Sequence, residues 1–230
     1  MRRNASLFLA SLFLVLSAGA FAQVATDANE NYQTHEGREN IAKGLGDPAR
    51  EERQKPRDIV DAMDLKPGAT VADVGTGVGF MLPYLSHAVG DTGKVVAEDI
   101  QNDFLDKAKF KAQLSRLSNV QFVLGTDRDP KLPADTLEGV LVLDVYHHFD
   151  YPEAMLEHIH DSLLSDGKLV IVEYYKRQGA MPGSDPDQAL RHIRLDQDGL
   201  IMEVEANGFR LISKRDLTPK SQYIAVFVRK

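Results

Sequence analysis

Short apolar runs alternate with amphipathic stretches along most of the chain, and these two patterns predict strands and helices. The expected strands are almost continuously apolar, which is typical of a parallel sheet that is covered on both faces. They are expected at Thr70–Val74, Lys94–Ile100, Val120–Gly125, Val140–Leu143 and Leu169–Tyr174. The helices between them are expected at Phe80–Val89, Asn102–Leu117 and Pro152–Leu164. The pattern therefore predicts an α/β domain with helices on both faces of the sheet.

The last part of the chain breaks this alternation. A helix is expected at Pro186–Asn207, and Gly208 ends it. Two strands follow, Phe209–Asp216 and Tyr223–Arg229, joined by a short turn around Pro219 with no helix between them. Strands with so short a connection pair antiparallel. We therefore expect a mixed, Rossmann-like sheet that is mostly parallel and carries an antiparallel C-terminal hairpin at one edge.

The first 22 residues have the pattern of a secretory signal peptide. Met1–Asn4 is positively charged, Leu7–Leu16 is apolar, and Ala20–Ala22 places small residues at both positions that a signal peptidase reads. We expect cleavage after Ala22, export to the periplasm or the medium, and no stable membrane insertion afterwards. An uncleaved anchor is the alternative, but the apolar run contains serine and is barely long enough to cross a bilayer.

The segment that follows the expected cleavage site is polar. Residues 23–40 contain few apolar side chains and predict a flexible leader. From Arg38 to Met63 the pattern becomes helical, with proline breaks at Pro48 and Pro56. The folded domain is therefore expected to span residues 41–230.

Composition and charge narrow the classes of protein. The chain has 230 residues, of which 43% are hydrophobic and 27% charged, so one domain with a buried core is expected. Removal of Arg2 and Arg3 with the signal takes the formal net charge from −7 to −9, which disfavours a nucleic-acid partner. There is no cysteine, which excludes disulfides, thiolate metal sites and a cysteine nucleophile.

A glycine-rich loop joins the first strand to the next helix. Gly75, Gly77 and Gly79 give the spacing Gly-x-Gly-x-Gly, whereas a nicotinamide-binding loop needs its third glycine at the position of Phe80. Asp73 stands two residues before the first glycine. A carboxylate there would repel a pyrophosphate and attract a cation. The loop therefore favours a cationic nucleoside over a nicotinamide dinucleotide.

A second acid lies at the end of the second strand. Asp99 follows Gly75 by 24 residues, where a carboxylate can accept hydrogen bonds from both hydroxyls of a ribose. Side chains alternate along a strand, so Glu98 is expected to point to the opposite side. Asp99 is therefore the expected ribose ligand.

Together these segments resemble the motifs of the class I S-adenosylmethionine (SAM)-dependent methyltransferases, from about Gln54 to the C-terminus. The matching segments are Lys66–Gly68 with Val71–Phe80, Gly93–Ile100, Asn119–Val123 with Leu132–Pro133, and Leu163–Val172. In the last of these, Asp166 replaces the first glycine of the family's Leu-x-x-Gly-Gly-x-Leu segment. The resemblance implies a seven-stranded sheet with a reversed hairpin at one edge and SAM as the cofactor.

The resemblance also implies roles for individual residues. Gly75, Thr76 and Gly77 would line the methionine part of SAM, Asp99 would hold the ribose, and Ile100 would pack on the adenine. Either Asp127 or Asp129 would approach the adenine amino group, and Asp144 would meet the ammonium. The expected cofactor residues are Asp73, Gly75, Thr76, Gly77, Gly79, Asp99, Ile100, Asp127 and Asp144.

Two histidines follow the fourth apolar strand. His147 or His148 is a candidate general base, because a neutral imidazole accepts protons near pH 7. Alternatively both only pack the strand end, since methyl transfer often needs no more than a positioned nucleophile. Asp144 and these two histidines are one possible set of metal ligands, and His158 with His160 is another. The spacing of His158 and His160 puts them on different faces of a helix. No metal is expected.

The sequence thus predicts a SAM-dependent methyltransferase that acts on an unidentified, small acceptor. Residues 39–57 and Lys176–Pro186 are expected to cover the pocket, because no insertion domain is present. Export separates the protein from SAM made in the cytosol. An exported, non-catalytic protein that binds a nucleoside or another metabolite is therefore the alternative.

Overall fold

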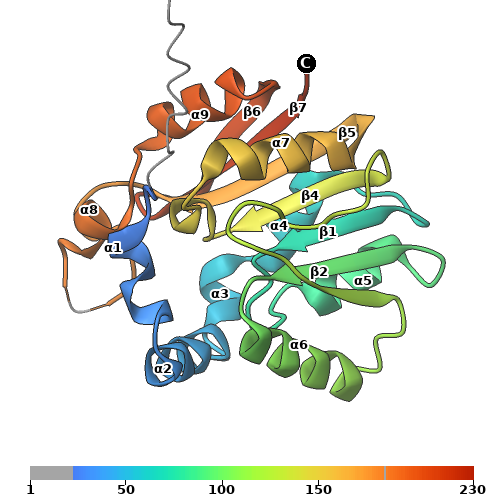
Figure 1. Cartoon of the computed structure of the whole chain (residues 1–230), viewed down its shortest axis with the longest axis horizontal. Coiled ribbons are helices and arrows are strands. Elements are labelled where there is room, and N and C mark those ends of the chain that lie inside the picture. The colour runs from blue at the N-terminus through green and yellow to red at the C-terminus, as the bar shows by residue number, and fades with distance from the viewer. Residues whose placement is uncertain (1–22, 184) are drawn as a thin grey trace, which may run out of the picture.

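The computed structural model describes residues 23–183 and 185–230, so the predicted signal peptide lies outside the described residues. Its centre is a seven-stranded sheet in the order β3-β2-β1-β4-β5-β7-β6 (Figure 1). The strands are β1 (Thr70–Val74), β2 (Lys94–Asp99), β3 (Val120–Leu124), β4 (Leu137–Leu143), β5 (Leu163–Tyr174), β6 (Phe209–Thr218) and β7 (Gln222–Arg229). The predicted mixed, Rossmann-like sheet is confirmed.

The direction of the strands defines one special position in the sheet. β1 pairs parallel with β2 on one side and with β4 on the other, so the chain order reverses between β1 and β4. β7 lies between β5 and β6 and pairs antiparallel with both. In open α/β sheets, ligands bind at the carboxyl ends of the strands where the order reverses. The fold therefore places the ligand crevice beyond β1 and β4.

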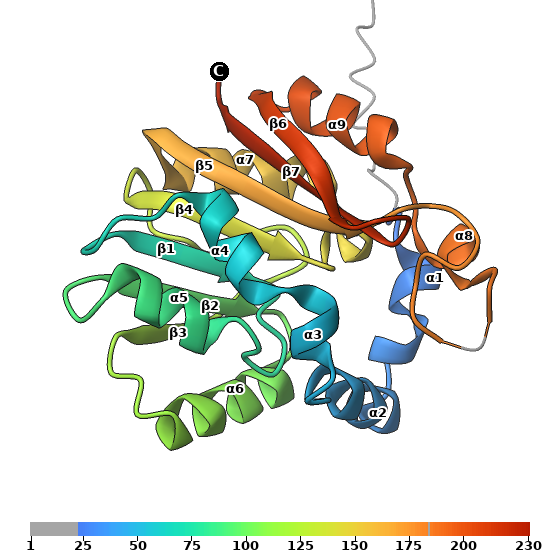
Figure 2. The same cartoon turned by 180° about the vertical axis from the view of Figure 1, so that it is seen from behind.

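Helices cover both faces of the sheet, and further short helices lie beyond the carboxyl ends of its central strands (Figures 1 and 2). The helices are α1 (Thr26–Asn29), η1 (Glu30–Tyr32, a 3₁₀ helix), α2 (His35–Leu45), α3 (Arg50–Gln54), α4 (Pro56–Met63), α5 (Leu82–Val89), α6 (Asn102–Leu114), η2 (Tyr146–His148, also 3₁₀), α7 (Pro152–Ser162), α8 (Gln188–His192) and α9 (Gln197–Ala206). α7 and α9 cover the face seen in Figure 1, and α4 and α5 cover the face seen in Figure 2.

Alternating side chains of the central strands fill two separate cores. In β4, Val140 and Val142 pack in the core beneath α7 and α9, whereas Leu141 and Leu143 pack in the core beneath α4 and α5. A strand that is buried on both faces has no need for polar positions, which explains its continuous apolar run. These two cores make the sheet a rigid base for the loops at its carboxyl edge.

The structure differs from the sequence prediction over residues 23–40. Instead of a flexible leader, the segment forms α1, η1 and the first half of α2, and the side chain of Thr34 caps α2 by accepting from the Gly37 amide at 3.0 Å. The Asn29 side chain also donates to the carbonyl of His148 at 3.0 Å. Tertiary contacts of this kind are invisible in a composition, and they order a segment with little hydrophobicity of its own.

The region before β6 also differs. The single helix predicted over Pro186–Asn207 is wrong: α8 ends at His192, and α9 begins only after Asp196. The Asp196 carboxylate accepts from the Gly199 amide at 2.9 Å and caps α9. An aspartate of this kind starts a helix more readily than it continues one. The break leaves α8 free to lie beside α1 at the carboxyl edge of the sheet.

Among the described residues, no helix combines the length and the apolar character that crossing a bilayer requires.

Candidate functional site

The loop after β1 is shaped by its glycines. Gly75, Gly77 and Gly79 have φ angles of 72°, 56° and 78°, a region that residues with a Cβ rarely adopt. A Cβ on Gly75 would lie 2.5 Å from a methyl group of Val145, which follows β4. The loop therefore packs closely against the residues that follow β4, and Gly75 and Val145 both line a cavity.

The predicted loop residues do not all reach this cavity. Gly75, Thr76 and Gly77 line it, together with Asp73. Gly79 does not line it; a Cβ there would meet Leu82 and Ala108, so this glycine allows α5 and α6 to pack closely. The Thr76 hydroxyl donates to the Asp73 carboxylate at 2.7 Å, which ties the loop to its own strand.

Asp99 and Glu98 both lie under this loop. Asp99 accepts from the amide of Gly77 at 2.9 Å and from that of Gln101 at 2.8 Å. Glu98 was expected to point away from the site, but its carboxylate accepts from the Gly75 amide at 3.3 Å and it lines the same cavity. The prediction for Glu98 is wrong because β2 ends here, and the loop folds over both sides of the strand end.

The carboxylates of Asp73, Glu98 and Asp99, at the carboxyl edge of the sheet, are buried. Burial raises the pKa of Asp73 and of Asp99 to about 6, against the opposing hydrogen bonds that each accepts. Burial, followed by the neighbouring charge of Asp99, raises the pKa of Glu98 well above its ordinary value. One oxygen of Glu98 has no hydrogen-bond partner among the described residues. Such a cluster favours a ligand that brings positive charge or hydrogen-bond donors.

Asp144 occupies the end of β4 in a strained conformation. Its φ of 56° is unusual for a residue with a side chain, and its amide donates to the carbonyl of Val172 at 2.9 Å. The carboxylate accepts from Gln222 at 2.6 Å and from Gln54, and the Arg50 guanidinium lies 3.7 Å away. Burial raises the pKa of Asp144 to about 6 although the charge of Arg50 opposes this.

The far end of the cavity has an open, apolar wall. Ile100 is 47% exposed and lines the cavity beside Phe104. Asp127 also lines it, whereas Asp129 does not and instead lies 3.8 Å from His158 on α7. Of the two aspartates that the sequence left open, the structure thus brings Asp127 to the site.

The N-terminal helices close the opposite side of the cavity. Asn29, Tyr32 and Leu45 line it, and so does Arg50 on α3, whose guanidinium lies 4.5 Å from the ring centre of Phe80. Of the two predicted covers, residues 39–57 contribute Leu45 and Arg50, whereas no described residue of the Lys176–Pro186 segment lines this cavity.

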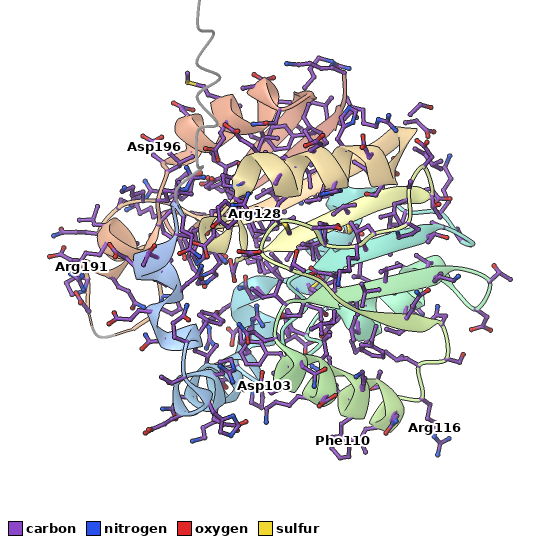
Figure 3. All side chains as sticks on the ribbon, in the orientation of Figure 1. Asp103, Phe110, Arg116, Arg128, Arg191 and Asp196 are labelled. Carbon is purple, nitrogen blue, oxygen red and sulfur yellow. The ribbon has the colours of Figure 1, made fainter. Side chains whose placement is uncertain are left out.

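An ion pair holds α2 against α6. The Arg38 guanidinium donates to Asp103 at 2.7 Å and to the carbonyl of Tyr32 at 2.9 Å, and Asp103 lies at the start of α6 beside α2 (Figure 3). Sequence reasoning did not identify Asn29, Tyr32 or Gln54 as site residues. An aromatic side chain within an otherwise polar leader was the one available signal.

The two predicted catalytic histidines have different surroundings. His148 lines the cavity, and burial together with the neighbouring His147 and His192 lowers its pKa well below the usual value. His147 is buried behind it and does not line the cavity; its Nδ1 lies 2.7 Å from the carboxylate of Glu173 on β5. Only His148 therefore faces a bound molecule directly.

The chain is similar to known methyltransferases in sequence. A family model described as "Methyltransferase domain" matches residues 72–171, which run from β1 through most of β5. The ubiquinone/menaquinone biosynthesis C-methyltransferase UbiE of Escherichia fergusonii is 25% identical over 187 residues, covering 70% of this chain and 74% of that protein.

The chain is also similar to solved methyltransferase structures. A SAM-dependent methyltransferase from Aquifex aeolicus is 27% identical with a TM-score of 0.75, covering 83% of this chain and 98% of its own. The chain is a SAM-dependent methyltransferase. The [4+2]-cyclase SpnF, at 14% identity and a TM-score of 0.65, shares the fold over 76% of this chain and 80% of its own. For this methyltransferase, the acceptor must therefore be sought in the residues of the site rather than in the fold.

Proposed function

We propose that the protein transfers the methyl group of SAM to a small-molecule acceptor that binds between η2 and the N-terminal helices. One observation carries this proposal: a single cavity runs from Ile100, past the glycine loop, to His148 and Asp150. The end at Ile100 is lined by apolar side chains, whereas the end at His148 and Asp150 also carries polar side chains. This difference suits the binding of two different molecules. The N-terminal helices cover the end at His148 with Asn29 and Tyr32, which suits a small molecule.

The residues present fit the three parts of SAM. Asp99, Ile100 and Phe104 all line the cavity. The Asp99 carboxylate would accept from the ribose hydroxyls, and Ile100 and Phe104 would offer apolar surface to the adenine. The buried carboxylates near the loop suit a positively charged sulfonium. When bound, SAM supplies a methyl group that is activated by this positive sulfur.

Arg50 and Asp144 match the amino-acid end of SAM. The guanidinium and the carboxylate lie 3.7 Å apart, and the two side chains are only 10% and 13% exposed. A zwitterion brings one charge of each sign, so its carboxylate pairs with Arg50 and its ammonium with Asp144. This arrangement replaces one buried ion pair by two, which satisfies both side chains and orients the methionine part.

The acceptor end combines aromatic and polar groups. Tyr32, Phe149 and Met155 offer apolar surface, while Asn29 and His148 offer polar atoms. These side chains suit a partly apolar molecule that carries a nucleophilic atom. Relatives named for small-molecule methylation, such as UbiE, support the same class of acceptor.

The cofactor assignment is tested by calorimetry with SAM and its demethylated product on the chain that starts at Gln23. Asp99→Asn removes a charge-assisted hydrogen bond of about 1.5–3 kcal/mol, so we expect SAM affinity to fall roughly 10- to 100-fold. Asp106→Asn is the matched control, because Asp106 is exposed on α6 and pairs only with neighbours on that helix. Equal SAM affinity in the Asp99 variant and the wild type would contradict the assignment.

A non-catalytic binding protein is the alternative function, and only methyl transfer separates the two. The assay supplies SAM labelled in its methyl group and a panel of small phenols, thiols and amines. Transfer of label to any of them excludes the alternative. If the protein binds SAM but the label stays on SAM even when a mixture of small metabolites from a lysate is added, the proposal of methyl transfer fails. The cofactor assignment then still stands.

We also propose that the protein is exported, on the basis of the charged, apolar and small-residue pattern of residues 1–22. Expression in a bacterium with separate periplasmic and cytosolic extraction tests this. Intact mass is expected to give a periplasmic chain that begins at Gln23. A full-length chain confined to the cytosol would contradict export.

A further inference from the structure

Three histidines from two distant parts of the chain meet beside the cavity. His147 and His148 lie on η2, and His192 is the last residue of α8. Their ring centres are separated by 4.1 Å, 4.8 Å and 5.2 Å. One ring nitrogen from each lies within 4.8 Å of those of the other two. The break between α8 and α9 brings His192 to this place.

His147 is held in the orientation that a metal ligand needs. The Glu173 carboxylate lies 2.7 Å from its Nδ1, and the same carboxylate accepts from the amides of His147 and Tyr174 at 3.2 Å and 2.7 Å. A carboxylate fixed in this way binds the proton-bearing nitrogen, so the lone pair of His147 lies on Nε2. Histidines that ligate metals characteristically donate their other nitrogen to a carboxylate or a carbonyl.

His148 is oriented in the same manner by Asn29. The Asn29 amide nitrogen donates to the carbonyl of His148 at 3.0 Å and to Asp150 at 3.3 Å, which turns its oxygen toward the His148 ring. That oxygen lies 2.9 Å from Nδ1, so this nitrogen donates and the lone pair again lies on Nε2. The remaining contact of Nε2 is a long one, 3.4 Å from the Tyr32 hydroxyl.

His192 completes the set without a partner that would compete for it. Within residues 23–183 and 185–230, no hydrogen bond is formed by either of its ring nitrogens. It is half-buried and ends a helix of five residues, so its ring can move with little disturbance of the core. Three imidazoles therefore converge at one place, and two of them are fixed with the lone pair on Nε2.

We infer that His147, His148 and His192 form a binding site for a divalent transition-metal ion such as Zn²⁺, with Glu173 and Asn29 orienting two of the ligands. Imidazole suits zinc, and three protein ligands leave a fourth position for another molecule. Metal–nitrogen bonds of about 2.0–2.1 Å require the nitrogens to lie roughly 3.3 Å apart, so the rings close by up to about 1.5 Å on binding.

The site has a consequence for the proposed function but does not depend on it. His147 and His192 lie outside the cofactor cavity, whereas His148 lines its acceptor end. A metal held here would be placed to bind a hydroxyl or thiol of the acceptor and to lower the pKa of that group. The sequence alone suggested no metal because His192 follows His148 by 44 residues and His147 by 45.

The test measures Zn²⁺ binding to the untagged chain that starts at Gln23, after removal of bound metal, by competition with a chromogenic chelator. We expect one ion per chain. His192→Ala removes a ligand and is expected to weaken binding at least 100-fold, and Glu173→Gln, which keeps a hydrogen-bond acceptor, roughly 10- to 100-fold. Visible absorption of the Co²⁺-loaded protein reports the ligand geometry independently of any activity.

The double variant His158→Ala/His160→Ala is the matched control. It removes two imidazoles on α7 that lie outside the cluster, so its Zn²⁺ affinity should equal that of the wild type. Equal affinity of the wild type and His192→Ala, with both folded by circular dichroism, would overturn the proposal. SAM affinity should be unchanged in His192→Ala. If the wild type binds Zn²⁺ but does not bind SAM, the proposed function fails and the metal site stands.

Discussion

At the scale of single residues, the site is dominated by acids that the fold removes from water. Asp73, Asp99 and Asp144 come from three strand ends. Asp73 and Asp99 are buried, and the side chain of Asp144 is only 13% exposed. Burial is the largest cause of the raised pKa of each of them. Buried carboxylates without a full set of partners are costly in the free protein, and that cost is recovered when a cationic ligand binds.

This electrostatic arrangement predicts weaker SAM binding in acid. The pKa values of Asp99 and Asp144 are raised to about 6, so both side chains are largely ionised at pH 7.5 and protonated at pH 5. SAM affinity should therefore fall as the pH drops through 6, by roughly tenfold per pH unit for each carboxylate that must ionise. Calorimetry between pH 5 and pH 8 measures this. Asp144→Asn should bind less tightly and show a shallower dependence; an unchanged slope would contradict the role of Asp144.

Binding is a better readout of these acids than stability. A raised pKa in the folded state means that their contribution to the free energy of unfolding is full below pH 4 and is lost as the pH rises through 6. The lowered pKa of His192, about 4, acts in the opposite sense: its contribution is present above pH 6.5 and is lost as the pH falls. Because these opposite contributions change in the same pH range, the pH dependence of stability does not isolate the acids.

The glycine loop gives a second prediction at this scale. Gly75→Ala adds a Cβ that meets Val145 at 2.5 Å in a backbone conformation with a φ of 72°, so the free energy of unfolding should fall by about 1–3 kcal/mol. SAM binding should be lost with it. Gly44→Ala is the control, because a Cβ there meets nothing within 4 Å on α2 and should raise stability by up to about 1 kcal/mol. Urea unfolding compares the two; equal effects would contradict the contact.

At the scale of elements, the reversal between β1 and β4 creates the cavity and the N-terminal helices close it. The sheet supplies Asp73, Asp99 and Asp144 at one edge, while α1 to α3 supply Tyr32 and Arg50 from the opposite side. Few apolar contacts hold these helices: the cluster around Ala42, Val78 and Phe104 is small. Elements with so few buried contacts open more readily than a core does.

Opening of this cover is expected to depend on Arg38. Arg38→Ala removes the contact with Asp103 and the hydrogen bond to Tyr32, which are worth about 1 kcal/mol at a partly exposed position. Amide hydrogen exchange over residues 26–45 should become faster, and SAM affinity should fall about fivefold. Lys43→Ala is the control, because Lys43 hydrogen-bonds only within α2. Exchange that is equally slow in both variants would show that the ion pair does not hold the cover.

At the scale of the whole molecule, stability rests on two cores and on no covalent cross-link. The chain contains no cysteine, and the cores on the two faces of the sheet hold its central strands. The cavity, by contrast, is lined by polar groups from both halves of the sheet. A bound ligand therefore joins parts of the molecule that the cores stabilise separately.

Cofactor binding should accordingly raise the melting temperature. At a SAM concentration of 100 times its dissociation constant, the gain is about 2.7 kcal/mol, which corresponds to roughly 5–10 °C for a chain of this size. Differential scanning fluorimetry measures the shift. A reduced nicotinamide dinucleotide at the same concentration should give none, because the loop lacks the glycine spacing and carries Asp73. A shift with the nicotinamide and not with SAM would reverse the assignment.

Local patterns in the sequence determined the sheet, the helices between its parallel strands and the enzyme class. The apolar runs of β1, β2 and β4 and the glycine spacing after β1 depend only on neighbouring residues, since strand burial and loop torsions are set within a few positions. The reversed C-terminal hairpin follows from the shortness of its turn in the same way. The fold, the enzyme class and the cofactor predicted from these patterns are confirmed.

Only the tertiary structure decided which distant groups meet. The polar segment 23–40 is ordered by contacts with η2, Glu98 lies under a loop that folds over the end of its strand, and Asp127 rather than Asp129 reaches the cavity. His192 joins His147 and His148 only because α8 ends before α9 begins. Each of these depends on the relative position of elements far apart in the chain, which periodicity and spacing within a segment do not encode.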